Sequence, residues 1–161
     1  MSESKQIVRQ GAAQTQCHAD VIHPINPQAR RRTTSLGDAT GLTRMGVHIN
    51  VLAPGGLSTE PHTHASVDEF IYVLSGQGTV TLGGNSHLVG AGDFIGFPAN
   101  GPAHAMTNTG GEDLVYLVGG NRPVVDVCDY PQAGKRLYAF EGPVGRQYDV
   151  VDIANVEPLR R

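Results

Sequence analysis

Residues 68–97 read DEFIYVLSGQGTVTLGGNSHLVGAGDFIGF, a run of short apolar segments separated by glycine turns. Val, Ile, Tyr, Phe and Thr favour strands, and paired turn residues such as Gly-Gly and Gly-Asn favour tight hairpins. Each segment is too short for a helix, and no helical periodicity runs through the stretch. We therefore predict four antiparallel strands, over residues 68–74, 79–82, 86–89 and 94–97.

The flanking sequence continues this pattern in both directions. Apolar residues alternate with other residues from Met45 to Val51, which predicts a strand with one apolar face. Shorter strands are predicted at residues 62–64, 104–107 and 114–118. A series of about eight short strands with turns at near-regular spacing is typical of an all-β antiparallel sandwich or barrel.

Two further segments flank this barrel, which we assign to residues 41–121. Residues 1–40 predict an irregular N-terminal arm, and its Arg30-Arg31-Arg32 cluster receives no function beyond a solvated surface. Residues 122–161 predict a C-terminal extension that packs on the barrel, with strands at 124–128 and 135–140. Asp129-Tyr130-Pro131 is interpreted as the turn between those two strands.

Composition excludes several classes of function. The chain has 161 residues, enough for one domain, and its net charge of -3 provides no positive field for nucleic acid. No apolar run approaches the roughly 18 residues of a membrane span, and the first residues do not resemble a secretory leader. We therefore expect a cytoplasmic protein, in which Cys17 and Cys128 are reduced thiols of minor structural importance.

The residues that carry chemistry are three histidines and a glutamate. His62 and His64 are two positions apart, so on a strand both imidazoles project from the same face. Glu69 follows closely, and His104 lies on a later strand that can pair within the same barrel. Three imidazoles and one carboxylate form a site for one divalent transition metal: Mn, Fe, Co, Ni or Zn. Four protein ligands leave a position open for substrate, as in catalytic sites.

The spacing of these residues resembles the two motifs of the cupin superfamily. The first motif, G(x)5HxH(x)3–4E(x)6G, matches at Gly56, His62, His64, Glu69 and Gly76. The second, G(x)5PxG(x)2H(x)3N, matches at Gly92, Pro98, Gly101, His104 and Asn108 with one departure. Ala99-Asn100 places two residues between the proline and the glycine where the family has one, and we expect a local bulge there, with His104 retained.

This resemblance implies a double-stranded β-helix, or jelly roll, with His62, His64, Glu69 and His104 as metal ligands. Glu69, Ile71 and Val73 would line the barrel, and Asp68 would point outward because neighbouring strand residues face opposite ways. Phe70, Tyr72 and Leu74 would form an apolar outer face. Many cupins are dimers, and this face indicates a homodimer.

Other polar residues are candidates for catalysis. His48 and Asn50 share a strand face that looks either into the barrel mouth or into solvent, and an inward histidine could transfer protons. Arg122 could hold an anionic substrate or form a surface salt bridge.

Two functional hypotheses follow from these residues. The first is a metal-dependent isomerase, decarboxylase or dioxygenase acting on a small polyhydroxy or carboxylate compound. A sugar phosphate would need a basic grip, and the barrel segment offers only Arg44 unless Arg122 or Lys135 turns inward. The second hypothesis is a non-enzymatic module that binds or stores a sugar-like small molecule. A metal-free epimerase is disfavoured because all four ligands are retained, and a thiol dioxygenase because cupins of that type generally lack the glutamate.

Overall fold

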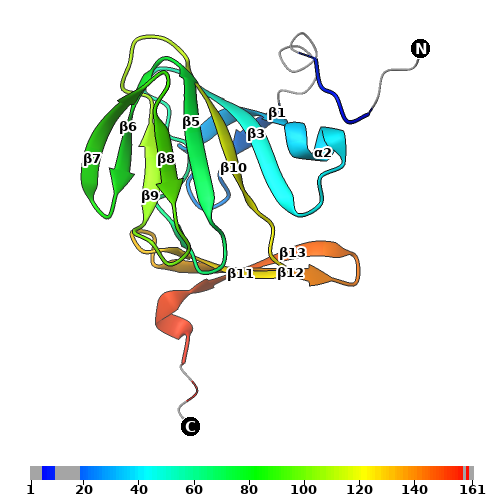
Figure 1. Ribbon diagram of the computed structural model, residues 1–161. Helices are drawn as coiled ribbons and strands as arrows, with labels where there is room; N and C mark the ends of the chain where they lie inside the picture. The colour runs from blue at the N-terminus through cyan, green and yellow to red at the C-terminus, as the bar shows by residue number, and fades with distance from the viewer. Residues whose placement is uncertain (1–4, 10–18, 158, 160–161) are drawn as a thin grey trace.

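A computed structural model describes residues 5–9, 19–157 and 159 of the chain. The described part is mostly β-structure (Figure 1). Its strands are β1 (Ala19–Ile22), β2 (Arg30–Ser35), β3 (Met45–Leu52), β4 (Thr63–His64), β5 (Glu69–Ser75), β6 (Gln77–Leu82), β7 (Asn85–Gly90), β8 (Phe94–Phe97), β9 (His104–Thr107), β10 (Leu114–Asn121), β11 (Val125–Tyr130), β12 (Lys135–Gly142) and β13 (Gly145–Asp152). Helix α2 (Leu36–Thr40) and a 3-10 turn, η1 (Ile153–Asn155), complete the elements.

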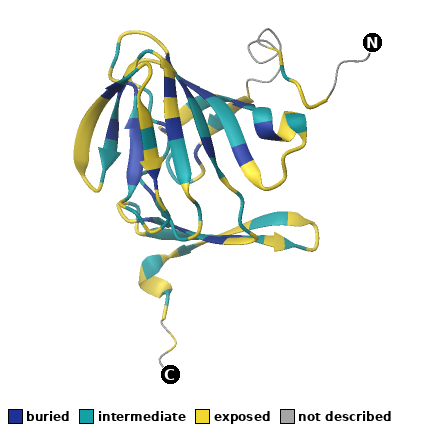
Figure 2. Ribbon diagram, in the orientation of Figure 1, coloured by how far each residue is buried: buried dark blue, intermediate teal, exposed yellow. Residues whose placement is uncertain are grey.

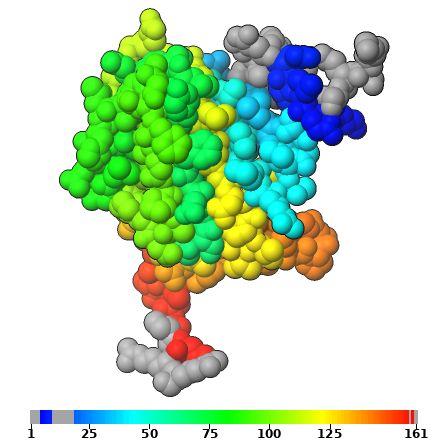
Figure 3. Space-filling view, in the orientation of Figure 1, coloured from blue at the N-terminus to red at the C-terminus, as the bar shows by residue number. Residues whose placement is uncertain are grey.

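The strands form three antiparallel sheets. A six-stranded sheet has the order β1-β2-β3-β10-β5-β8, and a three-stranded sheet, β7-β6-β9, faces it (Figure 1). A four-stranded sheet, β13-β12-β11-β4, runs across one end of this barrel. The space-filling view shows the C-terminal strands, in orange, lying directly against that end (Figure 3). The predicted all-β jelly-roll class is therefore confirmed.

The core lies between the six-stranded and the three-stranded sheets. Burial alternates along β5 (Figure 2). Ile71 and Val73 lie inside, and Tyr72 and Leu74 are exposed, as predicted. Each such apolar side chain contributes about 1.5–3 kcal/mol when it is fully buried. The largest fully buried apolar side chains are those of Leu52, Val73, Val80, Met106, Leu114 and Tyr116. This packing forms the rigid wall on which the polar site described below is built.

The prediction of an irregular arm is wrong for residues 19–40. This segment holds β1, β2 and α2, and β2 pairs with β3 over four positions, from Arg32↔Val51 to Ser35↔His48. Its sequence, RRRTTS, lacks the apolar alternation that identifies a strand. The strand forms because β3 supplies its backbone hydrogen-bonding partners. The short helix is marked locally by Ser35, whose hydroxyl accepts from the Asp38 amide, and by Gly41 in the left-handed region.

Helix α2 explains the two faces of β3. Gly37 of α2 packs closely on β3. A Cβ added at Gly37 would lie 3.1 Å from backbone atoms of both Met45 and Val47. This contact covers the outer side of β3, so the opposite side, with His48 and Asn50, faces the barrel interior.

Two strand boundaries in the C-terminal region also differ from the prediction. Asp129 and Tyr130 belong to β11, and the turn to β12 comes after them, so the proposed Asp129-Tyr130-Pro131 turn is wrong. The third strand, β13, was not predicted; its sequence GRQYDVVD has too little apolar alternation. No helix in the described ranges is long and apolar enough to cross a membrane.

Candidate metal centre

Three of the four predicted ligands converge on one point. The side-chain donor atoms of His62, Glu69 and His104 all lie within 4.8 Å of one another. The two histidines are held by reciprocal backbone hydrogen bonds of 3.1 and 2.8 Å across a β-bridge. Both are buried, with 8% and 5% of their surface exposed. The predicted strand at residues 62–64 thus consists of this bridge and the two-residue strand β4.

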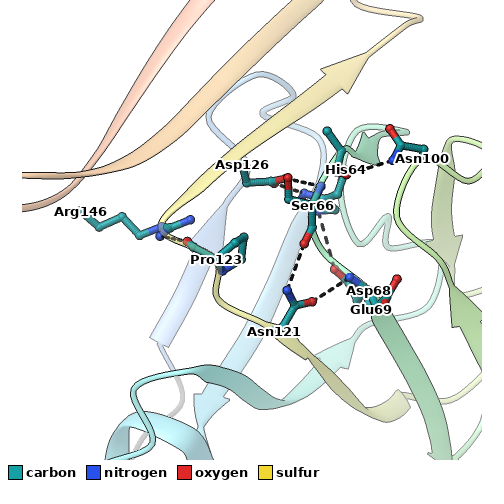
Figure 4. A network of polar contacts seen from close by, with 10 residues as sticks. His64, Ser66, Asp68, Glu69, Asn100, Asn121, Pro123, Asp126 and Arg146 are labelled. Atoms are coloured by element: carbon teal, nitrogen blue, oxygen red, sulfur yellow. Dashed lines mark hydrogen bonds and ion pairs between the residues drawn. The ribbon is translucent and has the colours of Figure 1, made fainter.

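His64 lies beside this group. Its Nε2 is 3.8 Å from a Glu69 carboxylate oxygen, and its Nδ1 is 2.6 Å from Asp126 Oδ2 (Figure 4). The Asp126 carboxylate is almost fully buried, and its other oxygen accepts the Ser66 amide at 2.9 Å. A carboxylate can only accept here, so Nδ1 carries the proton and Nε2 turns toward Glu69.

The other two imidazoles are oriented just as specifically. His62 Nδ1 donates to the Glu60 carbonyl at 3.1 Å, which leaves its Nε2 lone pair free. His104 stacks on Phe97, with ring centroids 3.8 Å apart and planes 9° apart. Neither ring nitrogen of His104 has a hydrogen-bond partner in the described structure, although both are buried. A metal ion at this point would satisfy one of these orphaned nitrogens, so the residues present fit such an ion.

The pKa shifts of His62 and His104 agree with this interpretation. Burial lowers the pKa of His62 well below its ordinary value and that of His104 to about 4. Both rings are therefore neutral at neutral pH, which is the form that binds metals. Burial raises the pKa of Glu69. Burial is the largest single influence on His64 and acts to lower its pKa, but the hydrogen bonds to Asp126 and Cys128 and the charge of Glu69 together raise the value to about 10. A bound metal ion would therefore displace a proton from His64.

Cys128 was expected to be structurally minor, but it lies at this site. Its Sγ and donor atoms of His62 and His64 form a second group within 4.8 Å. It is a free, buried thiol, paired in register with His64 across β4 and β11. Cys17 lies outside the described residues.

The extra residue in the second motif is accommodated by a turn. Asn100 adopts a left-handed conformation, with φ of 59°, and its amide donates to the His64 carbonyl at 2.7 Å. Its side chain donates to the Ala65 carbonyl at 3.0 Å (Figure 4). Asp68 is on the outside, as predicted, where it accepts the Ala99 amide at 2.8 Å. The departure from the motif therefore leaves His104 beside His62 and Glu69.

A cavity of about 300 Å³ opens beside the centre. His48 and Asn50 line it, which answers the question of which way their strand face looks. Arg122 lines a neighbouring hollow instead, and its guanidinium donates to Asp38 at 2.7 Å.

Sequence reasoning missed four residues of this site. Arg31 and Tyr116 line the cavity, Asp126 holds His64, and Tyr130 packs against His62 with ring centroids 5.7 Å apart. Period-two alternation in RRRTTS could have placed Arg31 on one face and its two arginine neighbours on the other.

Comparisons with known proteins agree with the fold and the motifs. The family model described as "Cupin domain" matches residues 48–120. The solved structure of a "putative sugar phosphate isomerase" from Acidithiobacillus ferrooxidans is 41% identical, covers 98% of each chain and superposes with a TM-score of 0.90. No curated protein matches the chain. The chain belongs to the cupin superfamily.

Two further solved structures are more distant. A sugar phosphate isomerase of the cupin superfamily from Silicibacter pomeroyi is 29% identical over 74% of this chain and 75% of its own, with a TM-score of 0.68. A predicted oxalate decarboxylase from Thermotoga maritima is 21% identical over 73% of this chain and 99% of its own, with a TM-score of 0.60. At that identity the second likeness concerns the fold alone.

Proposed function

We propose that this cupin is a metal-dependent enzyme that isomerises a small polyhydroxy substrate, a sugar or sugar phosphate. The observation that carries the proposal is the convergence of His62, Glu69 and His104 on one buried point, with His64 beside them. These four residues would hold one Mn, Fe, Co, Ni or Zn ion. The cavity beside them is large enough for a small substrate.

The comparisons favour isomerisation over the other reactions of such centres. The Acidithiobacillus ferrooxidans protein matches along nearly the whole chain, and its name reads "putative sugar phosphate isomerase". The decarboxylase resemblance is weaker and concerns the fold. Isomerisation also needs no oxidant, because it moves protons between neighbouring carbons and oxygens of one molecule.

His48 is the residue that we assign to proton transfer. Burial lowers its pKa below the ordinary 6.5, so the ring is neutral at neutral pH and can accept a proton. Its Nδ1 is buried without a hydrogen-bond partner. His48 would take the proton from the carbon next to the substrate carbonyl and return it to the former carbonyl carbon.

Asn50 and Tyr116 would hold the substrate hydroxyls. The Asn50 amide donates to the Tyr116 hydroxyl at 3.4 Å, and the Asn50 Oδ1 has no partner in the described structure. Burial raises the pKa of Tyr116 to about 12, so its hydroxyl keeps its proton and can donate to substrate. A bound divalent ion would supply a Lewis acid that polarises the substrate carbonyl.

The first experiment is elemental analysis of untagged protein purified without chelators. We expect about one transition-metal ion per chain, and loss of that ion in His62→Ala and Glu69→Ala with the fold retained, since other residues pack the core. His87→Ala is the matched control, because His87 is exposed on β7, and it should keep the metal. A wild-type protein that neither holds nor binds a metal on titration would contradict the proposal.

The second experiment tests the reaction. The metal-loaded protein is incubated with aldoses and their phosphates in D2O, and deuterium at the exchanging carbon is followed by NMR. We expect incorporation that falls about 10²–10⁴-fold in His48→Asn while metal content is unchanged. Binding of a sugar without any exchange would overturn the enzyme assignment in favour of a binding module.

A further inference from the structure

Arg31 differs from several other basic side chains of the described residues. Five of those are paired with carboxylates: Arg32, Arg122, Lys135, Arg136 and Arg146. Arg31 is half-buried in the cavity wall and forms no salt bridge within the described ranges, although its charge acts to lower the pKa of Glu69 in the same cavity. Its Nη1 donates a 2.7 Å hydrogen bond to the Ser58 carbonyl. Since a guanidinium has five N–H donors, most remain available to a ligand.

The strand that carries Arg31 directs it into the cavity. Along β2, Arg31 and Thr33 line the cavity, whereas Arg32 is exposed and donates to Asp113. Thr33 lies opposite Asn50 of β3 in the pairing register. The Thr33 hydroxyl is buried without a partner, as is Asn50 Oδ1, and Asn50 is only 6% exposed. The guanidinium therefore adjoins a polar wall whose hydrogen-bonding groups are unsatisfied.

We propose that Arg31 and Thr33 form a subsite for the phosphate group of the substrate. This inference rests on the proposed isomerase function and specifies its substrate class, a phosphate monoester. The guanidinium binds two oxygens in a fork, and the Thr33 hydroxyl can donate to a third, which suits phosphate better than a two-oxygen carboxylate. A half-buried charge without a partner is costly, and the doubly charged phosphate compensates it.

Arg31 would supply the basic side chain that a sugar phosphate needs for binding its phosphate group. Arg122 and Lys135 had been the candidates, but Arg122 is bound to Asp38 and Lys135 to Asp152. The substrate would then span the cavity, with its carbonyl end at His62, Glu69 and His104 and its phosphate at Arg31.

The test compares Arg31→Gln with Arg32→Gln, a matched control at the next position that faces outward. Calorimetric titration of each metal-loaded protein uses glycerol 3-phosphate, glycerol and malate as probes. We expect the wild type and Arg32→Gln to bind glycerol 3-phosphate more tightly than glycerol or malate. Arg31→Gln should lose at least tenfold in affinity for glycerol 3-phosphate and little for glycerol. Should Arg31→Gln fail to fold, Arg31→Lys, which keeps the charge without the fork, should bind with reduced affinity.

Each of the other possible outcomes contradicts either the phosphate subsite or the isomerase function. Equal affinity of the wild type and Arg31→Gln, or no binding of glycerol 3-phosphate, overturns the phosphate subsite. If malate binds more tightly than glycerol 3-phosphate and this binding depends on Arg31, the assignment of a phosphate monoester as substrate is wrong. Metal content measured in the same samples separates the two proposals. Arg31-dependent phosphate binding by a protein that takes up no metal during loading would refute the metal-dependent isomerase function and leave the subsite standing.

Discussion

At the scale of single residues, Asp126 sets the orientation of His64. Its carboxylate accepts from His64 Nδ1 at 2.6 Å and from the Ser66 amide at 2.9 Å. Such partners hold a ligating imidazole in one tautomer and one rotamer, and their loss typically costs 10–100-fold in metal affinity. Asp126 is therefore a positioning residue for the proposed ligand.

We predict that Asp126→Asn weakens metal binding by about 10–100-fold. The amide keeps the shape of the side chain but loses the charge that strengthens the bond. Competition with a chelator of known affinity measures the effect. Asp129→Asn, on the same strand but bonded to Arg136 at the surface, should bind metal like the wild type. Equal affinities of the Asp126 and Asp129 variants would show that Asp126 has no part in the centre.

Asn100 is the residue that makes the extra position in the second motif tolerable. Its left-handed backbone suits asparagine and glycine better than alanine. We predict that Asn100→Gly is less destabilising than Asn100→Ala by about 0.5–1 kcal/mol, since both lose the bond to the Ala65 carbonyl. Urea unfolding gives the two free energies. If the alanine variant were as stable as the glycine variant, the strain argument would fail.

At the scale of elements, β11 connects the C-terminal sheet to the centre. The alternate residues Asp126, Cys128 and Tyr130 are buried, on the side of β11 that faces the centre. Asp129 lies on the opposite side of the strand. Asp129 accepts two hydrogen bonds from Arg136 of β12, at 2.6 and 2.8 Å. These bonds lower the pKa of the Asp129 carboxyl.

This ion pair predicts a pH-dependent contribution to stability. Because the folded-state pKa of Asp129 is depressed, the stabilisation is present above the unfolded value of about 3.9 and disappears as the pH falls through the folded value. The pair is about a third exposed, so we expect Asp129→Asn to cost under about 1 kcal/mol at pH 6. At about pH 2, nearer the depressed folded-state pKa, the cost should be smaller. Denaturant unfolding at both pH values checks this, and a constant difference would contradict it.

At the scale of the whole molecule, the centre joins three sheets. Glu69 belongs to the six-stranded sheet, His104 to the three-stranded sheet and His64 to the four-stranded sheet. The donor atoms can converge only when all three sheets are packed together. The site is therefore a property of the complete fold, and no single hairpin contains it.

The outer face of the barrel predicts self-association. Tyr72, Leu74 and Phe94 are 40%, 45% and 66% exposed on neighbouring strands, and β8 is a sheet edge. Apolar side chains grouped in this way favour an interface. We expect light scattering to give a homodimer of twice 17.0 kDa, and Phe94→Glu to give a monomer. Val144→Glu, at the remote β12–β13 turn, should stay dimeric. A monomeric wild-type protein would refute the prediction.

The sequence by itself determined the strands from residue 45 to residue 118 and the ligand candidates. Those signals are local: side chains alternate with the pleat, glycines permit the turns, and the spacing of His62, His64 and Glu69 reflects one short segment. Even the inward face of β5 could be predicted, because the cupin resemblance assigns Glu69 to the metal site and alternation places Ile71 and Val73 on the same side.

Only the tertiary structure decided what surrounds those ligands. Strand β2 has no apolar alternation and exists because β3 offers it hydrogen bonds. The alternation in RRRTTS separates Arg31 from its two arginine neighbours, but only the pairing with β3 shows that the Arg31 face looks into the cavity. Asp126 and Cys128 meet His64 across more than sixty residues of chain. Contacts of this kind depend on how sheets pack and close, and no local periodicity records them.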